Sequence, residues 1–462
     1  MANFEIEQFF LGCLAHASYL LSSDGLAAVI DPQRDVELYL DAAAKKNLKI
    51  VAVIETHLHA DFVSGHHELA QRTGARIYLG DGSGARFEHA AVKTGDSIEI
   101  GRCRLDFLQT PGHTLESVCI AVTDLDEPGA PKAVFTGDTL FVGDVGRPDL
   151  SGDHTPQELA ALLYRSLHET LLKLPDETVI YPAHGAGSLC GRQMSTERSS
   201  TIGRERRMNY ALQANSVEEF VHLLTDSLPP RPEYFGRDVE LNRSGASSLA
   251  DLPRLKPVQA PEVRRMQAEG AVVLDTRPVR EFGAAHVPGS VHIALSGQYA
   301  SWAGRLLGLD HEIVLVGEDA DHLRESQLRL ARVGIEKVHA YLEDGVHGWV
   351  AGGQELESIP QVTADEFEEL RGSEPITVLD VRELGEVAAA AMEESVRIPL
   401  GQLPSRMAEV PRDRLLVVHC KGGYRSSIAT SLLRRAGVKD IANLTGGFDA
   451  WAAREKVGAA KA

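Results

Sequence analysis

The sequence predicts a multidomain α/β protein, with one larger N-terminal layered domain and two smaller α/β domains behind it. Its 462 residues make about three domains at roughly 150 residues each. Short β-branched and aromatic runs alternate with helical patterns over about the first 225 residues, and the second half contains an internal repeat. The composition, 43% hydrophobic and 24% charged, excludes collagen-like, coiled-coil and wholly disordered chains.

The charge balance and the cysteines limit the partners. With 47 Lys and Arg against 66 Asp and Glu, the formal charge is −19, which opposes binding to nucleic acid or to an anionic membrane. The first ten residues carry no base and no uncharged apolar run reaches about 18 residues, so we expect no signal peptide and no transmembrane helix. Five cysteines without a close pair suit a reducing compartment. We therefore expect a cytoplasmic homo-oligomer that acts on small molecules, with neither nucleic acid nor membrane as a partner.

Strands are expected in the first domain wherever a β-branched or aromatic run is closed by Asp, Gly, Pro or His. These runs are 27–30, 50–55, 105–109, 117–122, 133–136 and 178–181. A helix is expected over 157–174, because its apolar residues follow a 3.6-residue period between Pro156 and Pro175. Six prolines and a Ser/Gly stretch predict a linker or irregular segment over 227–261, so we place the first domain at 1–250.

Two tandem copies of one α/β unit are expected in the second half. The run VLDTR at 273–277 reappears as VLDVR at 378–382, and VHIAL at 291–295 reappears as VRIPL at 396–400. LEDG at 342–345 reappears as LTGG at 444–447. Because the copies are about 100 residues long, each is a small domain and not a solenoid repeat. We place them at 255–355 and 360–460.

A histidine-rich set follows the strands of the first domain. The run THLHADF at 56–62 comes directly after a predicted strand, and His113, Asp138 and His184 end later strands. Side chains at strand ends can converge at one edge of a sheet sandwich, where imidazole and carboxylate groups bind zinc or non-haem iron. Solvated loop histidines would explain a single residue but not the whole set in this order. The sequence therefore predicts a metal site.

This set closely resembles the metallo-β-lactamase fold over about residues 5–225. The runs FTGDTL, GRPD and YPAH, at 135–140, 146–149 and 181–184, further resemble the persulfide dioxygenase branch of that superfamily. The resemblance implies an αββα sandwich and one Fe(II) per chain, held by His57, His113 and Asp138. Around these ligands or on the substrate side it places His59, Asp61, His184 and Tyr181.

One departure from the superfamily pattern bears on the metal. The position after Asp61, a histidine in that pattern, is Phe62 here. The loss of a ligand for a second metal weakens the interpretation as a dinuclear zinc hydrolase, and two histidines with one carboxylate match non-haem iron oxygenases. The resemblance then implies oxidation of a low-molecular-weight thiol persulfide by O₂ to sulfite and thiol. A zinc-dependent thioester hydrolase of the glyoxalase II kind stays open as the alternative.

A cysteine loop in the last copy predicts a second active site. Cys420 ends a strand-like run and precedes two glycines and a helix pattern, so backbone N–H groups and a positive helix end surround its thiol. The loop resembles the rhodanese active site, in which the cysteine carries a persulfide and exchanges sulfur with sulfite or thiosulfate. A phosphatase loop, the alternative, has one more residue between Cys and Arg. The rhodanese resemblance implies catalytic roles for Cys420, Lys421 and Arg425, and a sulfur cradle made of Gly422, Gly423, Tyr424 and Ser426.

The first copy has no cysteine, so it resembles an inactive rhodanese domain, and we expect a spacer or docking surface. The whole chain thus resembles a fusion of a persulfide dioxygenase, an inactive rhodanese domain and an active one, as in bacterial sulfide-detoxifying proteins. Cys190, six residues beyond His184, is expected to be a packed structural thiol. The sequence indicates neither the thiol carrier nor the direction of sulfur flow.

Overall fold

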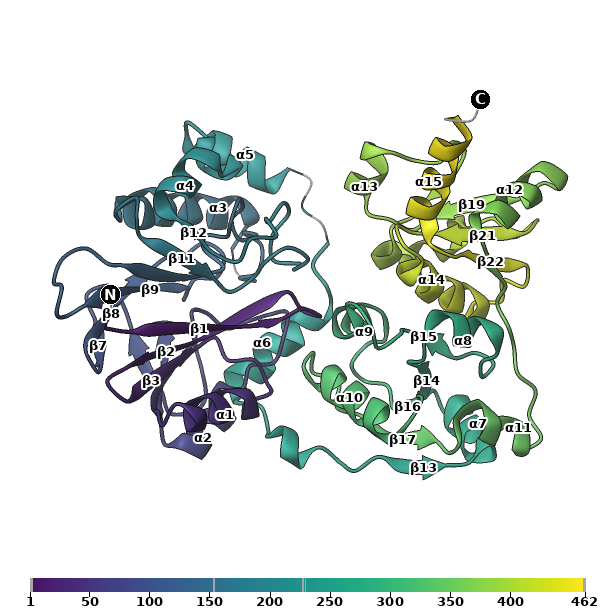
Figure 1. The fold of residues 1–462 in the computed structure, drawn as a ribbon, viewed down its shortest axis with the longest axis horizontal. Helices are drawn as coiled ribbons and strands as arrows, with labels where there is room; N and C mark the ends of the chain where they lie inside the picture. The colour runs from purple at the N-terminus through teal and green to yellow at the C-terminus, as the bar shows by residue number, and fades with distance from the viewer. Residues whose placement is uncertain (1–2, 153, 227, 229, 460–462) are drawn as a thin grey trace. The chain divides into compact units, whose positions relative to one another are not determined.

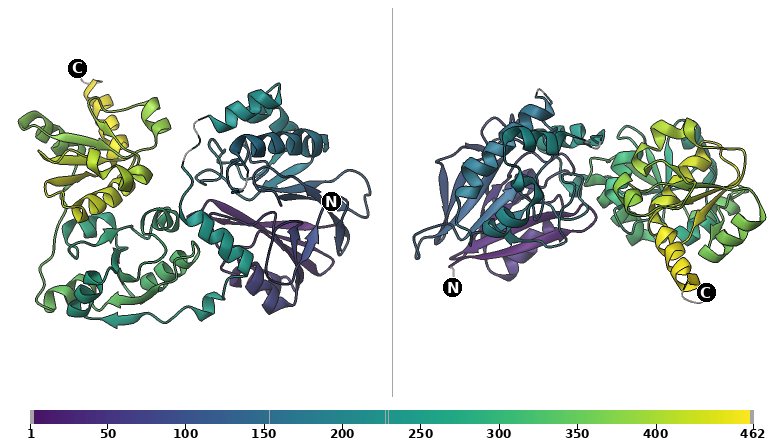
Figure 2. Two further views of the ribbon diagram at one scale, coloured as in Figure 1. Left: turned by 180° about the vertical axis from the view of Figure 1, so that it is seen from behind. Right: turned by 90° about the horizontal axis from the view of Figure 1, so that it is seen from above.

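The computed structural model describes residues 3–152, 154–226, 228 and 230–459, in two compact units (Figures 1 and 2). The first unit comprises residues 1–252 with 331–334, and the second comprises 253–330 with 335–462. Both units contain helices as well as strands, which confirms the predicted α/β class. Among the described residues, no helix is long and apolar enough to cross a membrane.

Two six-stranded sheets form the first unit. The sheet of order β1-β2-β3-β4-β5-β6 has its strands at Glu5–Leu11, His16–Ser23, Leu26–Ile30, Lys49–Ile54, Arg76–Gly80 and Ala90–Val92. The sheet of order β12-β11-β10-β9-β8-β7 has, from β7 to β12, Ser97–Ile100, Cys103–Gln109, Val118–Asp124, Ala133–Gly137, Val179–Pro182 and Ser200–Thr201. Tyr19 and Ile54 of the first sheet share one buried apolar core with Phe107 and Phe135 of the second. The sheets therefore pack face to face as a sandwich.

Helices cover both outer faces of the sandwich, so the layers run helix, sheet, sheet, helix (Figure 1). On the first sheet, Tyr39 and Leu69 from the helices join a buried core with Val29 and Val53. The helices on this side are α1 (Glu37–Lys45) and α2 (His66–Thr73), and those on the other are α3 (Pro156–Arg165), α4 (Ile202–Met208) and α5 (Val217–Thr225). The helix predicted over 157–174 is α3, continued by a π-helical turn and a 3-10 turn at Ser166–Thr170 and Leu171–Lys173. This order confirms the αββα architecture.

Helix α6 (Tyr234–Ser244) corrects one prediction, because the prolines and the Ser/Gly stretch predict a linker or irregular segment over 227–261. The prolines of that segment stand on either side of the helix and not inside it, so they do not interrupt its hydrogen bonds. A short 3-10 turn at Leu249–Asp251 follows. Tyr234, Phe235 and Asn242 are buried, so α6 is an integral part of the first unit.

Two parallel five-stranded sheets make up the second unit, and they share one strand order. The sheet of order β13-β17-β16-β14-β15 has, from β13 to β17, Lys256–Val258, Val272–Asp275, Val291–His292, Ile313–Val316 and Val338–Leu342. The sheet of order β18-β22-β21-β19-β20 has, from β18 to β22, Gln361–Val362, Thr377–Asp380, Val396–Arg397, Leu416–His419 and Ile441–Leu444. The shared order agrees with the tandem copies expected from the sequence.

Each sheet of the second unit is accompanied by its own helices (Figure 2). Those of the first copy are α7 (Ala260–Ala268), α8 (Val279–Ala284), α9 (Tyr299–Leu306), α10 (Ala320–Ala331) and α11 (Gly345–Ala351). Those of the second are α12 (Ala364–Ser373), α13 (Leu384–Ala389), α14 (Tyr424–Arg435) and α15 (Gly447–Ala459), with 3-10 turns at Leu400–Gln402 and Pro404–Glu409.

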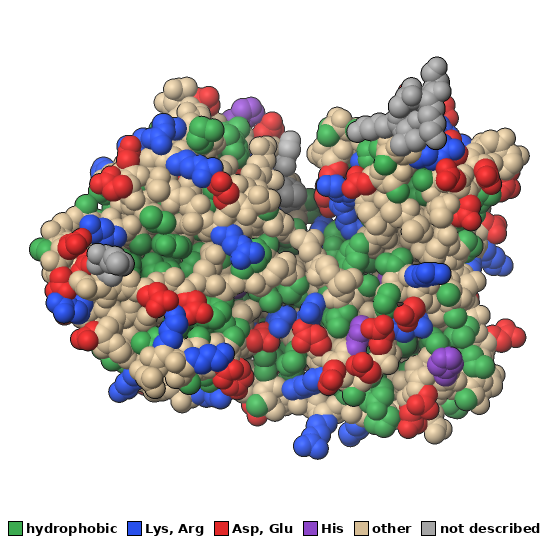
Figure 3. Space-filling model, viewed as in Figure 1, with side chains coloured by type: hydrophobic (Ala, Val, Ile, Leu, Met, Phe, Trp, Pro, Cys, Tyr) green, Lys and Arg blue, Asp and Glu red, His purple; other side chains and the backbone are tan. Residues whose placement is uncertain are grey.

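Acidic and basic side chains are interspersed over the face drawn in Figure 3. Many form surface ion pairs, such as Arg86 with Glu240 and Arg265 with Glu262. Among the described residues on this face, no continuous basic patch is visible.

Candidate active sites

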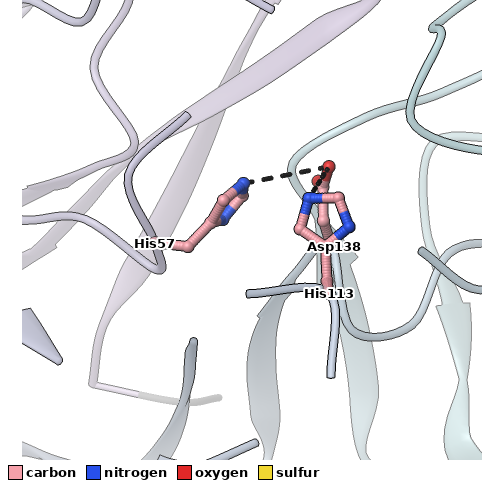
Figure 4. Close-up of side chains that lie close together, drawn as sticks. All are labelled: His57, His113 and Asp138. Atoms are coloured by element: carbon pink, nitrogen blue, oxygen red, sulfur yellow. Dashed lines mark ion pairs between the residues drawn. The ribbon is translucent and has the colours of Figure 1, made fainter. Parts of the chain in front are cut away.

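Three strand-end side chains predicted as metal ligands lie together in the first unit (Figure 4). His57 follows β4 in one sheet, whereas His113 and Asp138 follow β8 and β10 in the other. The Nε2 atoms of His113 and His57 lie 3.4 Å and 3.9 Å from Oδ2 of Asp138. All three side chains are buried, and their ligand atoms are close enough to share one ion.

Hydrogen-bond partners decide which ring nitrogen of each histidine faces this centre. Nδ1 of His113 donates to the carbonyl oxygen of Arg147 at 3.0 Å. The Thr56 hydroxyl donates to Oδ2 of Asp31 at 2.9 Å, and it therefore accepts from Nδ1 of His57 at 3.0 Å. With both Nδ1 atoms protonated, each Nε2 presents its lone pair to the centre.

The protonation states of the trio suit metal binding. Burial lowers the pKa of His113, and burial together with the neighbouring His59 holds the pKa of His57 well below its ordinary value. Burial alone would raise the pKa of Asp138, but the surrounding histidines outweigh it and hold that pKa well below its usual range. Neutral imidazole and ionised carboxylate are the forms that coordinate a cation.

Orphaned polar atoms provide a test of whether these residues fit a metal. Among the described residues, Nε2 of His113 and Oδ2 of Asp138 are buried without a hydrogen-bond partner. Buried polar atoms in that state are unfavourable, and a cation between them removes the cost. Two imidazole nitrogens and a carboxylate oxygen are donors that iron and zinc both accept. The residues therefore fit one such ion.

His184 and Asp61 lie on the other side of the Asp138 carboxylate. Nδ1 of His184 donates to Oδ1 of Asp138 at 2.8 Å, and its Nε2 lies 2.9 Å from Oδ2 of Asp61. Burial alone would lower the pKa of His184, but the two carboxylates raise it to about 10. His184 thus holds one oxygen of Asp138 and leaves the other directed at the two histidines. Cys190 lies beside Asp61 and His184, and burial raises the pKa of its thiol well above the ordinary range.

His59 and Tyr181 each have different neighbours from those of His184 and Asp61. Nε2 of His59 lies 3.2 Å from Oδ1 of Asp31 and 3.1 Å from Oε2 of Glu55. Burial opposes its protonation, but these carboxylates raise the pKa of His59 well above its ordinary value. Tyr181 packs against Tyr19 and Phe135 at the core between the sheets. The position of Tyr181 around the ligands or on the substrate side stays a prediction.

Two buried residues that support the candidate metal-binding loop at 56–62 are absent from the sequence-based predictions. Asp31 accepts the Thr56 N–H at 2.7 Å in addition to its hydroxyl. Asn242, on α6, donates to the carbonyl oxygens of His59 and Phe62, each at 2.8 Å. Each is a single polar residue far from the loop in the sequence, so no local pattern could have identified it.

The Cys420 thiol lies at the end of β21, buried, and its loop leads into α14. The N–H of Gly423 donates to Sγ at 3.1 Å, and the Ser426 hydroxyl donates to it at 3.5 Å. Gly423 has φ +96°, a conformation that side chains disfavour. At the start of α15, the N–H of Phe448 donates to the carbonyl oxygen of Cys420 at 2.8 Å. The loop is therefore held by two helix N-termini.

The two basic residues of this loop differ in their surroundings. Both ends of the Arg425 guanidinium bind Glu386 on α13, at 2.6 Å and 2.7 Å. Burial would lower the pKa of Arg425, but Glu386 and the nearby Cys420 raise it. Lys421 is exposed. Glu386, which no sequence pattern indicates, thus neutralises part of the positive charge expected beside the thiol.

The strand register identifies what replaces the cysteine in the first copy. Across β19 and β21, the partner of Asp380 is the residue just before Cys420. Across β14 and β16, the partner of Asp275 is Val316, so Gly317 takes the cysteine position. The residue after it is acidic where the second copy has a lysine. The first copy therefore has no thiol at this position, and its loop carries an acid where the second copy carries a base.

Comparisons with known proteins agree with the division of the chain into one sandwich domain and two tandem copies. The family described as “Metallo-beta-lactamase superfamily” matches residues 11–184, and “Rhodanese-like domain” matches 259–352 and 363–454. Persulfide dioxygenase ETHE1 from Bos taurus is 32% identical over 222 residues, which cover 47% of this chain and 78% of that protein. A hydroxyacylglutathione hydrolase from Rhodopseudomonas palustris (strain BisB18) is 31% identical over 250 residues, which cover 52% of this chain and 88% of that protein.

A solved metallo-beta-lactamase structure from Staphylococcus aureus subsp. aureus COL extends the match beyond the first unit. It is 30% identical, with a TM-score of 0.66, and covers 73% of this chain and 98% of that one. The expected order of one metallo-β-lactamase domain and two rhodanese-like domains is thereby confirmed. The chain belongs to the metallo-β-lactamase superfamily, as a member in which two rhodanese-like domains follow the sandwich.

Proposed function

We propose that the chain oxidises a low-molecular-weight thiol persulfide with O₂ at one Fe(II), and moves sulfane sulfur through Cys420. The trio of His57, His113 and Asp138 carries the first part, because three protein ligands leave coordination positions open for substrate. Bound iron would supply the redox-active centre, which zinc lacks. The relatives named persulfide dioxygenase support this choice.

The oxidation balances with water as a reactant. One persulfide, one O₂ and one water give one thiol, one sulfite and two protons; the outer sulfur loses the electrons that O₂ gains. The chain's own residues keep the ligands in place. Thr56 holds the ring of His57, the Arg147 carbonyl holds that of His113, and His184 holds the carboxylate of Asp138.

The presence of Phe62 favours a site with one metal ion over a site with two. Its ring centroid lies 4.4 Å from that of His59 and 4.1 Å from that of His16, so it packs among the buried imidazoles. It brings no donor atom to the position where the superfamily pattern has a histidine. The ligand set is therefore complete for one metal and lacks an imidazole for a second.

Sulfur transfer uses the thiolate of Cys420. It attacks the outer sulfur of thiosulfate, a new Sγ–S bond forms as the S–S bond of thiosulfate breaks, and sulfite leaves with the electron pair. The reverse step returns sulfur from the Cys420 persulfide to sulfite. The Gly423 N–H and the Ser426 hydroxyl, both directed at Sγ, stabilise the negative sulfur.

O₂ uptake and metal content, measured on the same sample, test the proposal. Protein loaded anaerobically with Fe(II) is offered the persulfides of glutathione, coenzyme A and cysteine in turn. We expect one iron per chain, with sulfite formed in the amount of O₂ consumed. Asp138→Asn should abolish O₂ uptake and keep transfer from thiosulfate, and Cys420→Ser should do the opposite. No O₂ uptake with any persulfide would overturn the oxidation, and unchanged transfer by Cys420→Ser would overturn the transferase.

A zinc-dependent thioester hydrolase is the second candidate. Hydroxyacylglutathione hydrolases are among the relatives, and Asp61, His184 and Cys190 form a second group of possible donor atoms next to the trio. Two zinc ions per chain, with hydrolysis of an acylglutathione thioester and no O₂ uptake, would establish this function in place of the oxidation.

A further inference from the structure

The first copy contacts the helix that completes the sulfur loop of the second copy. His292, at the end of β15, and Ala294 lie against α14, which begins directly after Gly423 (Figure 1). Both copies belong to one compact unit, so this contact is part of its internal packing. The thiol-less copy therefore lies next to the machinery of the other.

Three hydrogen bonds make up this contact. The N–H of His292 donates to Oγ of Ser431 at 3.0 Å, and Nδ1 of His292 lies 2.8 Å from Oγ of Ser427. The Tyr424 hydroxyl donates to the carbonyl oxygen of Ala294 at 3.0 Å. Positions 424, 427 and 431 lie on one face of α14, because spacings of three and four residues return to the same side of a helix.

The surroundings of His292 fix the direction of its side-chain bonds. Its Nε2 lies 2.9 Å from the carbonyl oxygen of Arg277, so that nitrogen carries the proton. Burial lowers the pKa of His292 to about 4, which leaves the ring neutral near pH 7 and Nδ1 with a lone pair. The Ser427 hydroxyl therefore donates to Nδ1. Both side chains are fully buried, so water does not replace this bond.

The start of α14 also donates hydrogen bonds to the Cys420 thiol. Gly423, which caps the helix, and Ser426 in its first turn are the two donors to Sγ of Cys420. A helix N-terminus stabilises a thiolate only when it lies close to the sulfur. The face bound by the first copy and the groups that touch the thiol thus belong to the same two turns of one helix.

We propose that the first copy is the positioning element of the Cys420 loop, with His292 as its positioning residue. His292 holds α14 in register through Ser427 and Ser431, so that the Gly423 N–H and the Ser426 hydroxyl stay directed at Sγ. The inference rests on the sulfur transfer proposed for Cys420 and gives the copy without a thiol a part in it.

Alkylation of Cys420 by iodoacetamide in the full-length chain tests this role without relying on the transfer reaction. His292→Leu removes the side-chain bonds to Ser427 and to the Arg277 carbonyl and keeps the backbone bond to Ser431, whereas His292→Asn keeps an acceptor for Ser427. We expect the alkylation rate and the kcat of transfer from thiosulfate to fall about tenfold in His292→Leu and to recover partly in His292→Asn. KM should change less than kcat, because no contact to thiosulfate is removed.

Two further variants make the outcome specific. His286→Leu is the matched control, because His286 is a buried histidine of the same copy that stacks on Phe282, as His292 does, and bonds the Phe282 carbonyl. Ser427→Ala removes the same bond from the α14 side with a smaller change, and it decides the question if His292→Leu does not fold. Parental alkylation rates in His292→Leu or Ser427→Ala, or equal losses in His286→Leu, would overturn the positioning role. The parent protein could also transfer no sulfur while alkylation is still slower in His292→Leu. That result would refute the proposed sulfur transfer and leave the positioning role standing.

Discussion

Thr56 connects the metal centre to a buried acid through a single hydroxyl group. The hydroxyl donates to Asp31 and accepts from Nδ1 of His57, so the imidazole ring cannot turn without breaking a buried bond. Partners of this kind set the tautomer and basicity of metal-binding histidines. In the proposed site, the affinity for metal would therefore depend on a residue that is not itself a ligand.

Thr56→Val keeps the shape of the side chain and removes the hydroxyl. We expect the affinity for Fe(II) to fall by about 10- to 100-fold, measured by competition with a chelator. Thr178→Val is the matched control, because its buried hydroxyl donates to the Pro131 carbonyl at 2.9 Å, outside the metal centre. Equal losses in the two variants would contradict the orienting role of Thr56.

His292 makes the stability of the second unit depend on pH. Its pKa is about 4 in the folded chain and 6.5 ordinarily, so between these values the unfolded state binds a proton that the folded state does not. Stability therefore falls as the pH decreases through this window, by about 2 kcal/mol between pH 7 and pH 5 for this one group. Urea unfolding at the two pH values measures it, and His292→Asn should lose less. An identical pH dependence in that variant would refute the assignment.

Helix α6 shows how an element supports a loop from far along the chain. Asn242 bonds two carbonyl oxygens of the metal-binding loop through its amide NH₂, and its carbonyl oxygen accepts the Ser64 N–H at 2.7 Å. The amide thus satisfies both donors and acceptors of a buried backbone turn. A carboxylate at this position would face two carbonyl oxygens without a proton to donate.

Asn242→Asp should therefore weaken both the fold and the metal site. We expect the free energy of unfolding of the first unit to fall by about 2–4 kcal/mol, because two buried acceptors lose their donor. Metal content after purification should fall with it. Asn443→Asp is the control, since Asn443 is a buried amide of the second unit that donates to Gln361. If Asn242→Asp lowers the free energy of unfolding by the expected amount but leaves the metal affinity unchanged, α6 does not position the loop.

Elements were predictable where local pattern and environment agree. The runs at 27–30 and 133–136 lie within β3 and β10, because apolar β-branched segments closed by polar residues form buried strands. β2 is buried along its whole length, yet its sequence mixes His and Ser with Leu, so no two-residue period marks it. α6 was missed because the prolines beside it resemble those of a linker.

In the candidate metal site, the strand-end residues were predictable from the sequence and the residues that support them were not. His57, His113 and Asp138 each follow a strand, and the shared edge of a sandwich brings strand ends together. Their supports were not predictable, because Asp31 and Asn242 act through bonds to residues that are distant in sequence. The pairing of Arg425 with Glu386 was missed for the same reason.

At the scale of the whole molecule, the proposed metal ligands come from both sheets of the first unit, and none of the three lies in the second unit. His57 follows a strand of the β4 sheet, and His113 and Asp138 follow strands of the β8–β10 sheet. Removing the metal with a chelator should lower the thermal unfolding temperature of the first unit and leave that of the second unchanged. Calorimetry with and without Fe(II) measures both, and Asp138→Asn should be insensitive to the metal. A chelator effect that Asp138→Asn retains would place the ion elsewhere.

The two sheets of the second unit share one strand order, although only one of them is followed by a thiol. After a duplication, a copy without the catalytic residue is free to change, and the loop at 317–319 differs from the loop at 420–422. Under the proposed positioning role, the end of β15 is not free in this way, because His292 and Ala294 bond the helix that follows the Cys420 loop. Natural selection on the reactivity of Cys420 would therefore act on the first copy as well, and drift there would be confined to the side that faces its own cysteine-free loop.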